Sequence, residues 1–514
     1  MNAPRSRRRL SSIGLAPRSV FLAFFALTFI ALACWSFADP LVAAPDEQAH
    51  FIRAYAIDHG QLGHGGYTYN KALVEVSVPA AINFTKAYPR CFQFRAAIPA
   101  NCAPTWTRST AMVRTTTYVG HYPPLYYLLV GVGSLFSAHV PGLYLMRLAS
   151  SLVSAFMLAL CAYTIARWSK RRALAAGVAV TLTPIVWFLA ASVNPSGFEI
   201  TTAICLWTAL TIFALDYPEN PPRGLVAVIG GLASTLVLVR GLSPLFVVII
   251  GAVVALLVGP RRLGALVRRR RDVQWAAAGV VVAALLAAAW ILTQGTLNIA
   301  PDGAKVDSSW SEWHIIRLVL RHVHGWIQQS VGVLGWLDTP MPHWFYNLWY
   351  LIVIGVVVTG FVVASRRGKV AVLAITALSL LVPIVLVTRQ AHQLGIVWQG
   401  RDSMPLAVGV PILGAGLWTR SRHARSLQKN ITTVIVALVT LLTLGSFYLN
   451  LRRYSVGRTG TRLFFWHHEA WSPPTGTIVT MVVYGVVTMA LGALVIAWLR
   501  SSRHHVDDVF VSSH

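Results

Sequence analysis

The chain of 514 residues is 56% hydrophobic and only 12% charged, and its mean hydropathy is +0.61. A soluble protein usually carries about 25% charged residues, so this composition excludes an ordinary soluble enzyme and indicates a protein embedded in lipid. The formal net charge of +26 comes largely from short Lys and Arg clusters between apolar runs, which argues for membrane topology and against nucleic-acid binding.

Twelve apolar runs approach the length of about 20 residues that a helix needs to cross a hydrocarbon core about 30 Å thick. We predict spans near 19–38, 143–166, 173–193, 197–215, 223–240, 242–259, 275–294, 344–364, 369–388, 403–419, 431–450 and 476–499. Basic clusters and acidic residues then fall on opposite sides of the membrane if the N-terminus is inside. The sequence therefore predicts an all-α protein of the bacterial plasma membrane, with both termini in the cytoplasm.

These spans divide the chain into successive regions. They are a basic tail at 1–18, the first span at 19–38, a first extracytoplasmic loop at 39–142, spans two to seven at 143–294, an interfacial segment at 295–343, spans eight to twelve at 344–499 and a tail at 500–514. The first loop is by far the largest connection on the outer side. It is the place to look for chemistry.

That loop begins with PDEQAHFIRAYAIDHG at 45–60, which predicts a short helix. Asp46, His50 and Arg53 recur at helical spacing and share one face, with Glu47 beside them. Two interpretations are open. The acids can simply favour the helix N-terminus, whose free N–H groups attract negative charge. Alternatively, the chain holds a reactive carboxylate at the membrane surface.

Cys91 and Cys102 are the only cysteines outside the predicted spans. An extracytoplasmic loop is oxidising in most bacteria, so we predict a disulfide between them, the alternative being two unpaired thiols. The stretch HYPPLYYLLVGVGSLF at 121–136 has only about 15 apolar residues, which is short for a span. We predict a helix that lies at or dips into the outer membrane face.

The segment 295–343 is rich in Trp and His, which is typical of a surface helix at the membrane interface. His322 and His324 resemble metal ligands, but such residues are more often solvated members of an interfacial helix. The same holds for HHE at 467–469.

Four ionisable residues lie at the outer ends of predicted spans: Glu199, Arg240, Arg401 and Asp402. Charges this close to hydrocarbon are costly and usually face a cavity or a partner. A long side chain such as Arg240 can instead extend to the interface, but the shorter acids have less reach.

The order PDEQAHFIRAYAIDHG, HYPPLYYLLVGVGSLF, GLYLMRLASSL resembles the GT-C superfamily of membrane glycosyltransferases, such as lipid A aminoarabinose transferases and protein mannosyltransferases. The later stretches GVLGWLDTPMP and WQGRDSMPL resemble more closely an uncharacterised bacterial family of predicted multi-pass membrane proteins related to GT-C enzymes. That family commonly has an aromatic residue after Gly-Arg, where this chain has Asp402.

The resemblance implies a GT-C-like fold and transfer of a sugar from a polyprenyl-phosphate donor to an envelope glycan, lipid or protein. Asp46 would be the general base, His50 would orient it or share its proton, and Glu47 would orient the acceptor or help hold a divalent metal. Arg401 would bind the carrier phosphate, backed by Arg240 and Arg147. The further candidates for substrate or phosphate binding are Arg53, Tyr122, Tyr126, Glu199 and Asp402.

Two other classes of function stay open. A multi-pass transporter or flippase would show internal repeats, broken helices and charges at mid-membrane. The sequence has no convincing repeat, and its suggestive charges lie near the outer surface. A GT-C-like scaffold that binds the carrier lipid without turnover is the second alternative.

Overall fold

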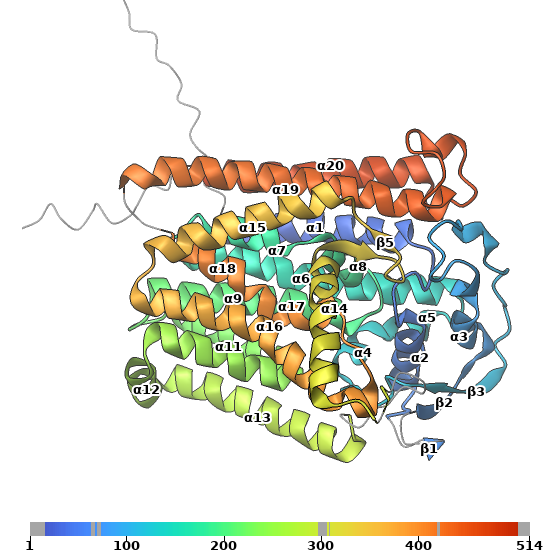
Figure 1. Cartoon of the computed structure of the whole chain (residues 1–514), viewed down its shortest axis with the longest axis horizontal. Coiled ribbons are helices and arrows are strands. Elements are labelled where there is room, and N and C mark those ends of the chain that lie inside the picture. The colour runs from blue at the N-terminus through green and yellow to red at the C-terminus, as the bar shows by residue number, and fades with distance from the viewer. Residues whose placement is uncertain are drawn as a thin grey trace, which may run out of the picture.

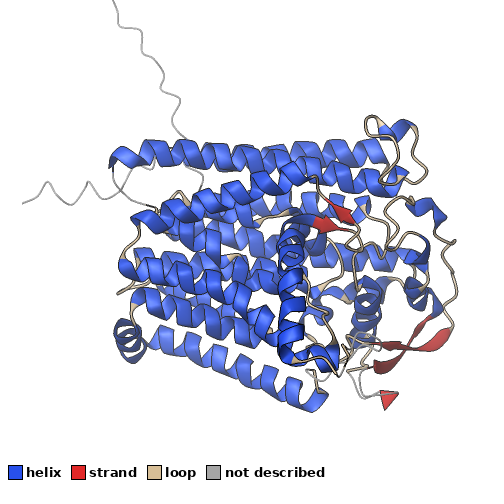
Figure 2. Ribbon diagram, in the orientation of Figure 1, coloured by secondary structure: helices blue, strands red, loops and turns tan. Residues whose placement is uncertain are grey.

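The computed structural model describes residues 16–62, 67–68, 73–296, 306–307, 309–418 and 422–501. Most of these residues form helices that run side by side in a bundle, with loops and a small sheet gathered at one end (Figure 1). Figure 2 shows how little of the chain is strand. The predicted tails at 1–18 and 500–514 lie almost entirely outside the described residues.

Among the described residues, eight helices are long and apolar enough to cross a membrane. They are α1 (Pro17–Ala38), α6 (Val140–Trp168), α9 (Pro195–Asp216), α13 (Arg271–Gln294), α15 (His343–Val363), α16 (Arg366–Leu394), α19 (Arg422–Val456) and α20 (Thr477–Arg500). A ninth span results if α11 (Ser243–Val258) and α12 (Pro260–Arg269), which meet at a bend of 102°, are counted together. The predicted all-α membrane protein is confirmed, but the predicted total of twelve spans is not.

Three of the predicted spans are broken or short helices. The run 173–193 divides before Pro184, which cannot donate the backbone hydrogen bond that a continuous helix requires. The run 403–419 also forms two helices, and the run 223–240 forms one of only 15 residues. The helices concerned are α7 (Leu174–Thr181), α8 (Pro184–Ala190), α10 (Arg223–Val237), α17 (Gly400–Ala407) and α18 (Gly409–Gly416).

The centre of the bundle is α9, which is buried along almost its whole length. Asn194 begins it, because its side-chain oxygen accepts a hydrogen bond from the Ser196 N–H. The first helix, α1, packs along α6 and also against the last helix, α20. Trp35 of α1 lies edge-on to Phe447 and Tyr484, with ring centroids 5.1 Å and 6.1 Å away.

The first loop contains a sheet that the sequence analysis did not predict. Strand β2 (Leu73–Pro79) pairs antiparallel with β3 (Met112–Thr117) and with the short β1 (Tyr67–Thr68). Its Val74, Val76 and Val78 alternate with more exposed residues and pack inward. The loop also holds α2 (Glu47–Asp58), α3 (Ala80–Asn83), α4 (Leu125–Val130), α5 (Val132–Phe136) and the 3₁₀ turns η1 (Phe84–Lys86), η2 (Tyr88–Cys91) and η3 (Ala100–Cys102).

The segment 295–343 contributes α14 (Glu312–Gly332), which crosses the direction of the spanning helices in Figure 1. Its Ser311 N-cap accepts a hydrogen bond from the His314 N–H. After it, β4 (Val333–Leu334) and β5 (Thr339–Pro340) form a tight hairpin. A last 3₁₀ turn, η4 (Phe465–His467), precedes α20.

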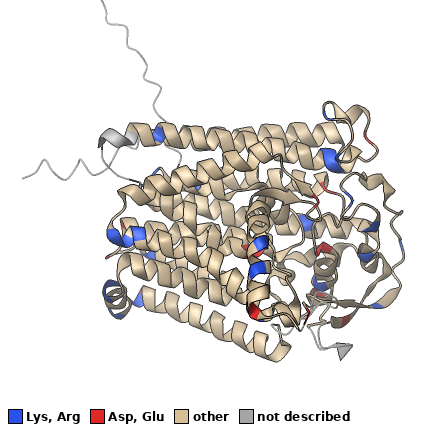
Figure 3. Ribbon diagram, viewed as in Figure 1, with Lys and Arg blue, Asp and Glu red and all other residues tan. Residues whose placement is uncertain are grey.

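Acidic residues gather mainly at the end of the bundle that carries the sheet, whereas basic residues lie at both ends (Figure 3). The basic residues of α12 and of the connections from α6 to α7 and from α15 to α16 lie at the end away from the sheet. At the other end, α2 and the hairpin carry acidic residues together with arginines. Clusters of basic residues in short connections are what the positive-inside rule describes for one side of a multi-pass protein.

Candidate functional site

The connection between α1 and α2 is a tight and strained turn. Asp46, at the N-cap position of α2, has φ 68° and ψ −4°, and Val42 has φ 62°. Such left-handed conformations are costly for residues with a Cβ, and most of all for a β-branched one. Several donors hold the turn: Trp336 Nε1 to the Val42 carbonyl at 3.0 Å and Asn194 Nδ2 to the Pro45 carbonyl at 3.3 Å.

The side chain of Asp46 makes no hydrogen bond to the helix that it precedes. Its Oδ1 accepts a hydrogen bond from the Tyr118 hydroxyl at 2.6 Å, and its Oδ2 accepts one from the Arg401 guanidinium. Helix capping alone therefore does not account for this carboxylate.

Asp46 is ionised at neutral pH. Burial alone would raise the pKa of its carboxyl group, but the charge of Arg401 and the hydrogen bonds from Tyr118 and Arg401 lower that pKa below its usual value. The side chain keeps 28% exposure, against 10% for Arg401. The site thus offers a proton acceptor that a substrate hydroxyl can approach.

His50 lies one turn further along α2 and is buried. Its Nδ1 is 2.8 Å from the Tyr127 hydroxyl, in a hydrogen bond that the structure puts in place of a direct bond to Asp46. Burial lowers the pKa of His50 to about 3, so the ring is neutral at pH 7.

Arg401 is positioned by the first turn of α17. Gly400 precedes it, and a Cβ at this position would lie 2.2 Å from the Trp326 carbonyl oxygen of α14, so only glycine allows this approach. The Gly400 N–H donates to Gln329 Oε1 at 2.8 Å. Asp402 also accepts a hydrogen bond, at 3.0 Å, from the Gln399 N–H that begins the helix.

Arg240 joins two of the predicted acids. Its Nη1 donates to Glu199 Oε2 at 3.1 Å and to Asp402 Oδ1 at 3.0 Å. The Ser243 hydroxyl donates to Glu199 Oε1 at 2.6 Å, and the Arg240 guanidinium lies 5.8 Å from the centre of the Tyr122 ring. Because Asp402 follows Arg401 directly, this cluster and the Asp46 pair share one turn of α17.

Glu47 and Arg147 form a two-pronged ion pair, with Nε–Oε1 at 2.7 Å and Nη2–Oε2 at 2.6 Å, and both side chains are buried. Arg147 also donates to three backbone carbonyls at the end of α1, those of Ser36, Asp39 and Pro40. This pair holds the turn against α6 and leaves neither side chain exposed, so the part predicted for Glu47 in acceptor binding and for Arg147 in phosphate binding stays a prediction.

Arg53 and Tyr126 are also buried. Arg53 Nη2 donates to the Tyr122 carbonyl at 3.2 Å, and within the described chain its Nε and Nη1 have no hydrogen-bond partner. The Tyr126 hydroxyl is 2.9 Å from Ser150 Oγ, at the contact of α4 with α6, and its predicted role in substrate binding stays a prediction.

A disulfide joins Cys91 and Cys102. Arg453 of α19 binds the loop between these cysteines. Its guanidinium donates hydrogen bonds to the Phe92, Arg95 and Ile98 carbonyls, and it also donates one to Asp338 Oδ2. The hairpin that carries Asp338 also carries Trp336, so the stretch GVLGWLDTPMP ties the disulfide loop to the turn at Asp46.

The described part of the chain contains no group of three or more His, Cys, Asp or Glu residues placed to hold a metal ion. His322 Nδ1 is 2.8 Å from the Leu318 carbonyl of its own helix. A small hollow with a cavity volume of about 10 Å³ lies beside the Asp46 pair, lined by Pro45, Gln329, Arg401 and neighbours from the hairpin.

Sequence reasoning missed Tyr118, Tyr127 and Arg453. Tyr118 stands three residues before the HYPP stretch, yet nothing in its neighbourhood marks it as a partner of Asp46. The pairing of Tyr127 with His50 had a weak signal, because both belong to stretches that the resemblance singled out.

Comparisons with known proteins complete these observations. A family model described as "Predicted membrane protein (DUF2142)" matches residues 29–410, well over half of the chain. No curated protein matches it. The chain is similar to two crystal structures of ArnT from Cupriavidus metallidurans, one bound to undecaprenyl phosphate and one in the apo state. Their identities are 15% and 14%, and both matches have a TM-score of 0.41 and cover 95% of this chain and 78% of the other. A likeness of this strength carries no conclusion about substrate.

Proposed function

The chain belongs to the family of predicted membrane proteins (DUF2142), and from that premise we propose that it is a membrane glycosyltransferase. It would move a sugar from a polyprenyl-phosphate donor to a hydroxyl group of a cell-envelope glycan, lipid or protein at the outer face of the plasma membrane. The observation that carries the proposal is Asp46, a partly exposed carboxylate that is ionised, held beside an arginine and not used as a helix cap. The motif order that resembles GT-C enzymes supports the same chemistry.

The reaction needs one base and one stabiliser of negative charge. The acceptor oxygen forms a bond to the anomeric carbon, the bond from that carbon to the phosphate oxygen breaks, and the hydroxyl proton passes to Asp46. The electron pair of the broken bond stays on the carrier phosphate. The planar guanidinium of Arg401 suits that phosphate because it matches two oxygens at once and stays charged.

Before substrate binds, Arg401 is engaged with Asp46. A carrier phosphate that takes over Arg401 would free Asp46 Oδ2 for the acceptor hydroxyl. It would also remove the strongest influence that lowers the pKa of Asp46, so the carboxylate would become a better base at the moment when the donor is in place. We propose this exchange of partners as the first step of the reaction.

The cluster around Arg240 would serve as a support. By holding Asp402 and Glu199 together, Arg240 fixes the turn of α17 that presents Arg401. Tyr122 lies against Arg240 and borders the same region, which makes it a candidate contact for the donor. Neutral His50 would support Asp46 by packing and not by carrying charge.

The test is Asp46→Asn. Asparagine preserves size, can still accept one of the two hydrogen bonds that Tyr118 and Arg401 donate, and begins a helix as well as aspartate does, but it cannot take a proton. We expect sugar transfer from polyprenyl-phosphate donors to fall by roughly 10²–10⁴-fold, the usual contribution of a general base, while expression and thermal stability stay near those of wild type. Transfer is measured with the purified protein in nanodiscs, a panel of such donors and an envelope extract as acceptor.

Arg401→Lys is the matched companion. Lysine keeps the charge but loses two-pronged phosphate recognition, so the KM for the donor should rise more than kcat falls. Full complementation of the envelope defect of a deletion strain by the Asp46→Asn protein, at matched expression, would remove Asp46 from the mechanism.

A flippase for a lipid-linked envelope precursor is the second candidate, because one observation favours it. Transporters often carry discontinuous helices near their sites, and α17 and α18 form such a pair beside Arg401. A flippase would move the lipid-linked sugar between leaflets of proteoliposomes without an acceptor. The wild-type protein and the Asp46→Asn variant would then both leave the sugar–phosphate bond intact.

A further inference from the structure

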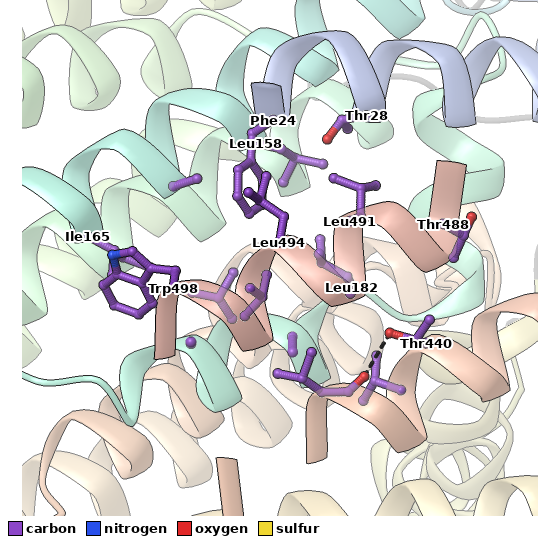
Figure 4. Close-up of a pocket in the computed structure, with 18 of the residues that line it drawn as sticks. Phe24, Thr28, Leu158, Ile165, Leu182, Thr440, Thr488, Leu491, Leu494 and Trp498 are labelled. Atoms are coloured by element: carbon purple, nitrogen blue, oxygen red, sulfur yellow. Dashed lines mark hydrogen bonds between the residues drawn. The ribbon is translucent and has the colours of Figure 1, made fainter. Parts of the chain in front are cut away.

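A large apolar cavity lies between α1, α6, α7, α19 and α20, at the opposite end of α1 from the Asp46 turn. Its cavity volume is about 140 Å³, and it is open on one side. Figure 4 shows Phe24, Leu158, Leu491 and Leu494 directed toward a common space, with Trp498 at its edge. No step of the proposed reaction uses this cavity.

The lining suits a hydrocarbon chain. Nearly all of it is aliphatic or aromatic, and the exceptions are four threonines: Thr28, Thr440, Thr443 and Thr488. The Thr440 hydroxyl donates to the Val436 carbonyl of its own helix, so it is not offered to a ligand. Leu494 and Val495 stay partly exposed, which places the opening of the cavity on the side of the bundle that lipid surrounds. An empty void here would forfeit the dispersion contacts that a lipid chain can supply.

Basic groups cluster where the cavity reaches the end of α20. The Arg172 guanidinium lies 5.8 Å from the centre of the Trp498 ring and donates to the Leu499 and Ser501 carbonyls. Lys429 Nζ is 3.5 Å from the Arg500 carbonyl oxygen; Lys429 is half-buried and Arg500 is exposed. Basic pockets between membrane helices bind the head groups of anionic lipids.

We propose that the cavity holds one acyl chain of an anionic phospholipid, whose phosphate lies on the basic cluster formed by Arg172, Lys429 and Arg500. The 22 residues of α1 span about 33 Å, so this cluster and Arg401 lie at opposite ends of the bundle. The phosphate of a sugar donor bound at Arg401 would therefore not reach the cluster. The lipid contacts α1, α6, α19 and α20 and so stabilises the packing of the first helices against the last two.

Native mass spectrometry of the full chain, purified in mild detergent, tests the proposal. We expect the wild-type protein to retain phosphatidylglycerol or cardiolipin. Ala179→Phe places a ring in the cavity and should remove most of the retained lipid. Ala288→Phe makes the same change on the exposed face of α13 and should retain lipid as the wild type does. Replacing both Lys429 and Arg500 by Gln should leave a bound lipid but shift it toward zwitterionic species.

Equal retention by the Ala179→Phe protein would overturn the proposal, and so would a loss of polyprenyl phosphate, and not of phospholipid, on that substitution. If Ala179→Phe fails to fold, delipidated wild-type protein decides the matter. Phosphatidylglycerol should then raise its Tm more than phosphatidylcholine with the same acyl chains. An equal rise with both lipids would contradict the role of the basic cluster.

Discussion

At the scale of single residues, the turn before α2 stores backbone strain. Left-handed conformations at Val42 and Asp46 cost on the order of 1–3 kcal/mol each, and they persist only where neighbours over-determine them. Here those neighbours are Trp336, Asn194 and the three bonds from Arg147 to the end of α1. In this conformation the backbone of the turn is buried, and the Asp46 carboxylate points away from its own helix, toward Tyr118 and Arg401.

The candidate site was only partly predictable at this scale. Asp46, Arg401, Arg240, Glu199 and Asp402 were all named from sequence, because charged residues beside apolar spans need partners. Which charge pairs with which is set by the fold. Glu47 and Arg147 have the same chemistry as the others, yet they are sealed in a structural pair. Tyr118 had no signal, since its role depends on a strand that returns it to the turn.

The first prediction concerns Tyr118. Phenylalanine at this position removes one hydrogen bond from ionised Asp46 and so raises its pKa. A general base acts only when it is ionised, that is, above its pKa. As the pH falls, the variant should therefore lose activity at a higher pH than the wild type does. Loss of a hydrogen bond to a partly exposed charged group should move the pH profile by about one pH unit. The pH–rate profile of kcat/KM measures the shift.

Tyr350→Phe is the control for that measurement, because among the described residues the Tyr350 hydroxyl has no hydrogen-bond partner. Its profile should coincide with that of the wild type. An unchanged profile for Tyr118→Phe would separate Tyr118 from the state of Asp46.

The second prediction concerns Glu47. Glutamine removes the charge opposite Arg147 and leaves a buried guanidinium uncompensated, which costs about 3–5 kcal/mol. We expect a large fall in Tm for the detergent-solubilised protein. Glu312→Gln makes the same change in the exposed pair with Arg389 and should cost about 0–1 kcal/mol. Equal effects of both substitutions would show that the buried pair does not hold the turn.

At the scale of elements, hydropathy predicted where helices lie but not where they break. Hydropathy averaged over about 20 residues treats 173–193 as one span. Pro184 nevertheless marks the break in the sequence. The division between α17 and α18 at Val408 has markers as well, because Gly409 follows it and Pro411 has no N–H to bond the Ala407 carbonyl; α17 then packs on α14 and α18 on α7. The sheet did have a signal: LVEVSVP at 73–79 alternates with the period of a strand.

The third prediction concerns the disulfide loop. Two independent devices hold it, the Cys91–Cys102 bond and the carbonyl contacts of Arg453. Serine at both cysteines removes a short cross-link, worth about 2–3 kcal/mol by chain entropy, but the loop should stay largely protected from trypsin at the exposed Arg95. When Arg453→Gln is combined with the two serines, trypsin should cleave the peptide bond after Arg95 rapidly.

Limited proteolysis followed by mass spectrometry reads out the cleavage. Arg453→Gln with the disulfide intact serves as the control and should be cleaved slowly. Free thiols at both positions of the non-reduced wild-type protein, found by alkylation, would contradict the pairing itself.

At the scale of the whole molecule, charge was the strongest sequence signal. The position of charged residues near the ends of the bundle could be read from the sequence before any contact was known, because lipid penalises charge regardless of which helices meet (Figure 3). The number of spans was less legible, since short and bent helices such as α10 and α11 can be counted only once their packing is seen.

The fourth prediction fixes the orientation. Cysteine at position 312 should react with an impermeant maleimide on intact cells, whereas cysteines at 170 and 268 should react only after the membrane is opened. The background should be low, because Cys34, Cys161 and Cys205 are buried and the other two are joined. Labelling of 170 and not of 312 would invert the topology.

The contact between α1 and α20 has a consequence for biosynthesis. The ribosome delivers α1 first and α20 last, so the face of α1 that carries Trp35 must wait in the bilayer while every other helix is inserted. Arg401 likewise emerges long after Asp46. A nascent chain therefore carries Asp46 without its ion-pair partner until most of the helices have been made.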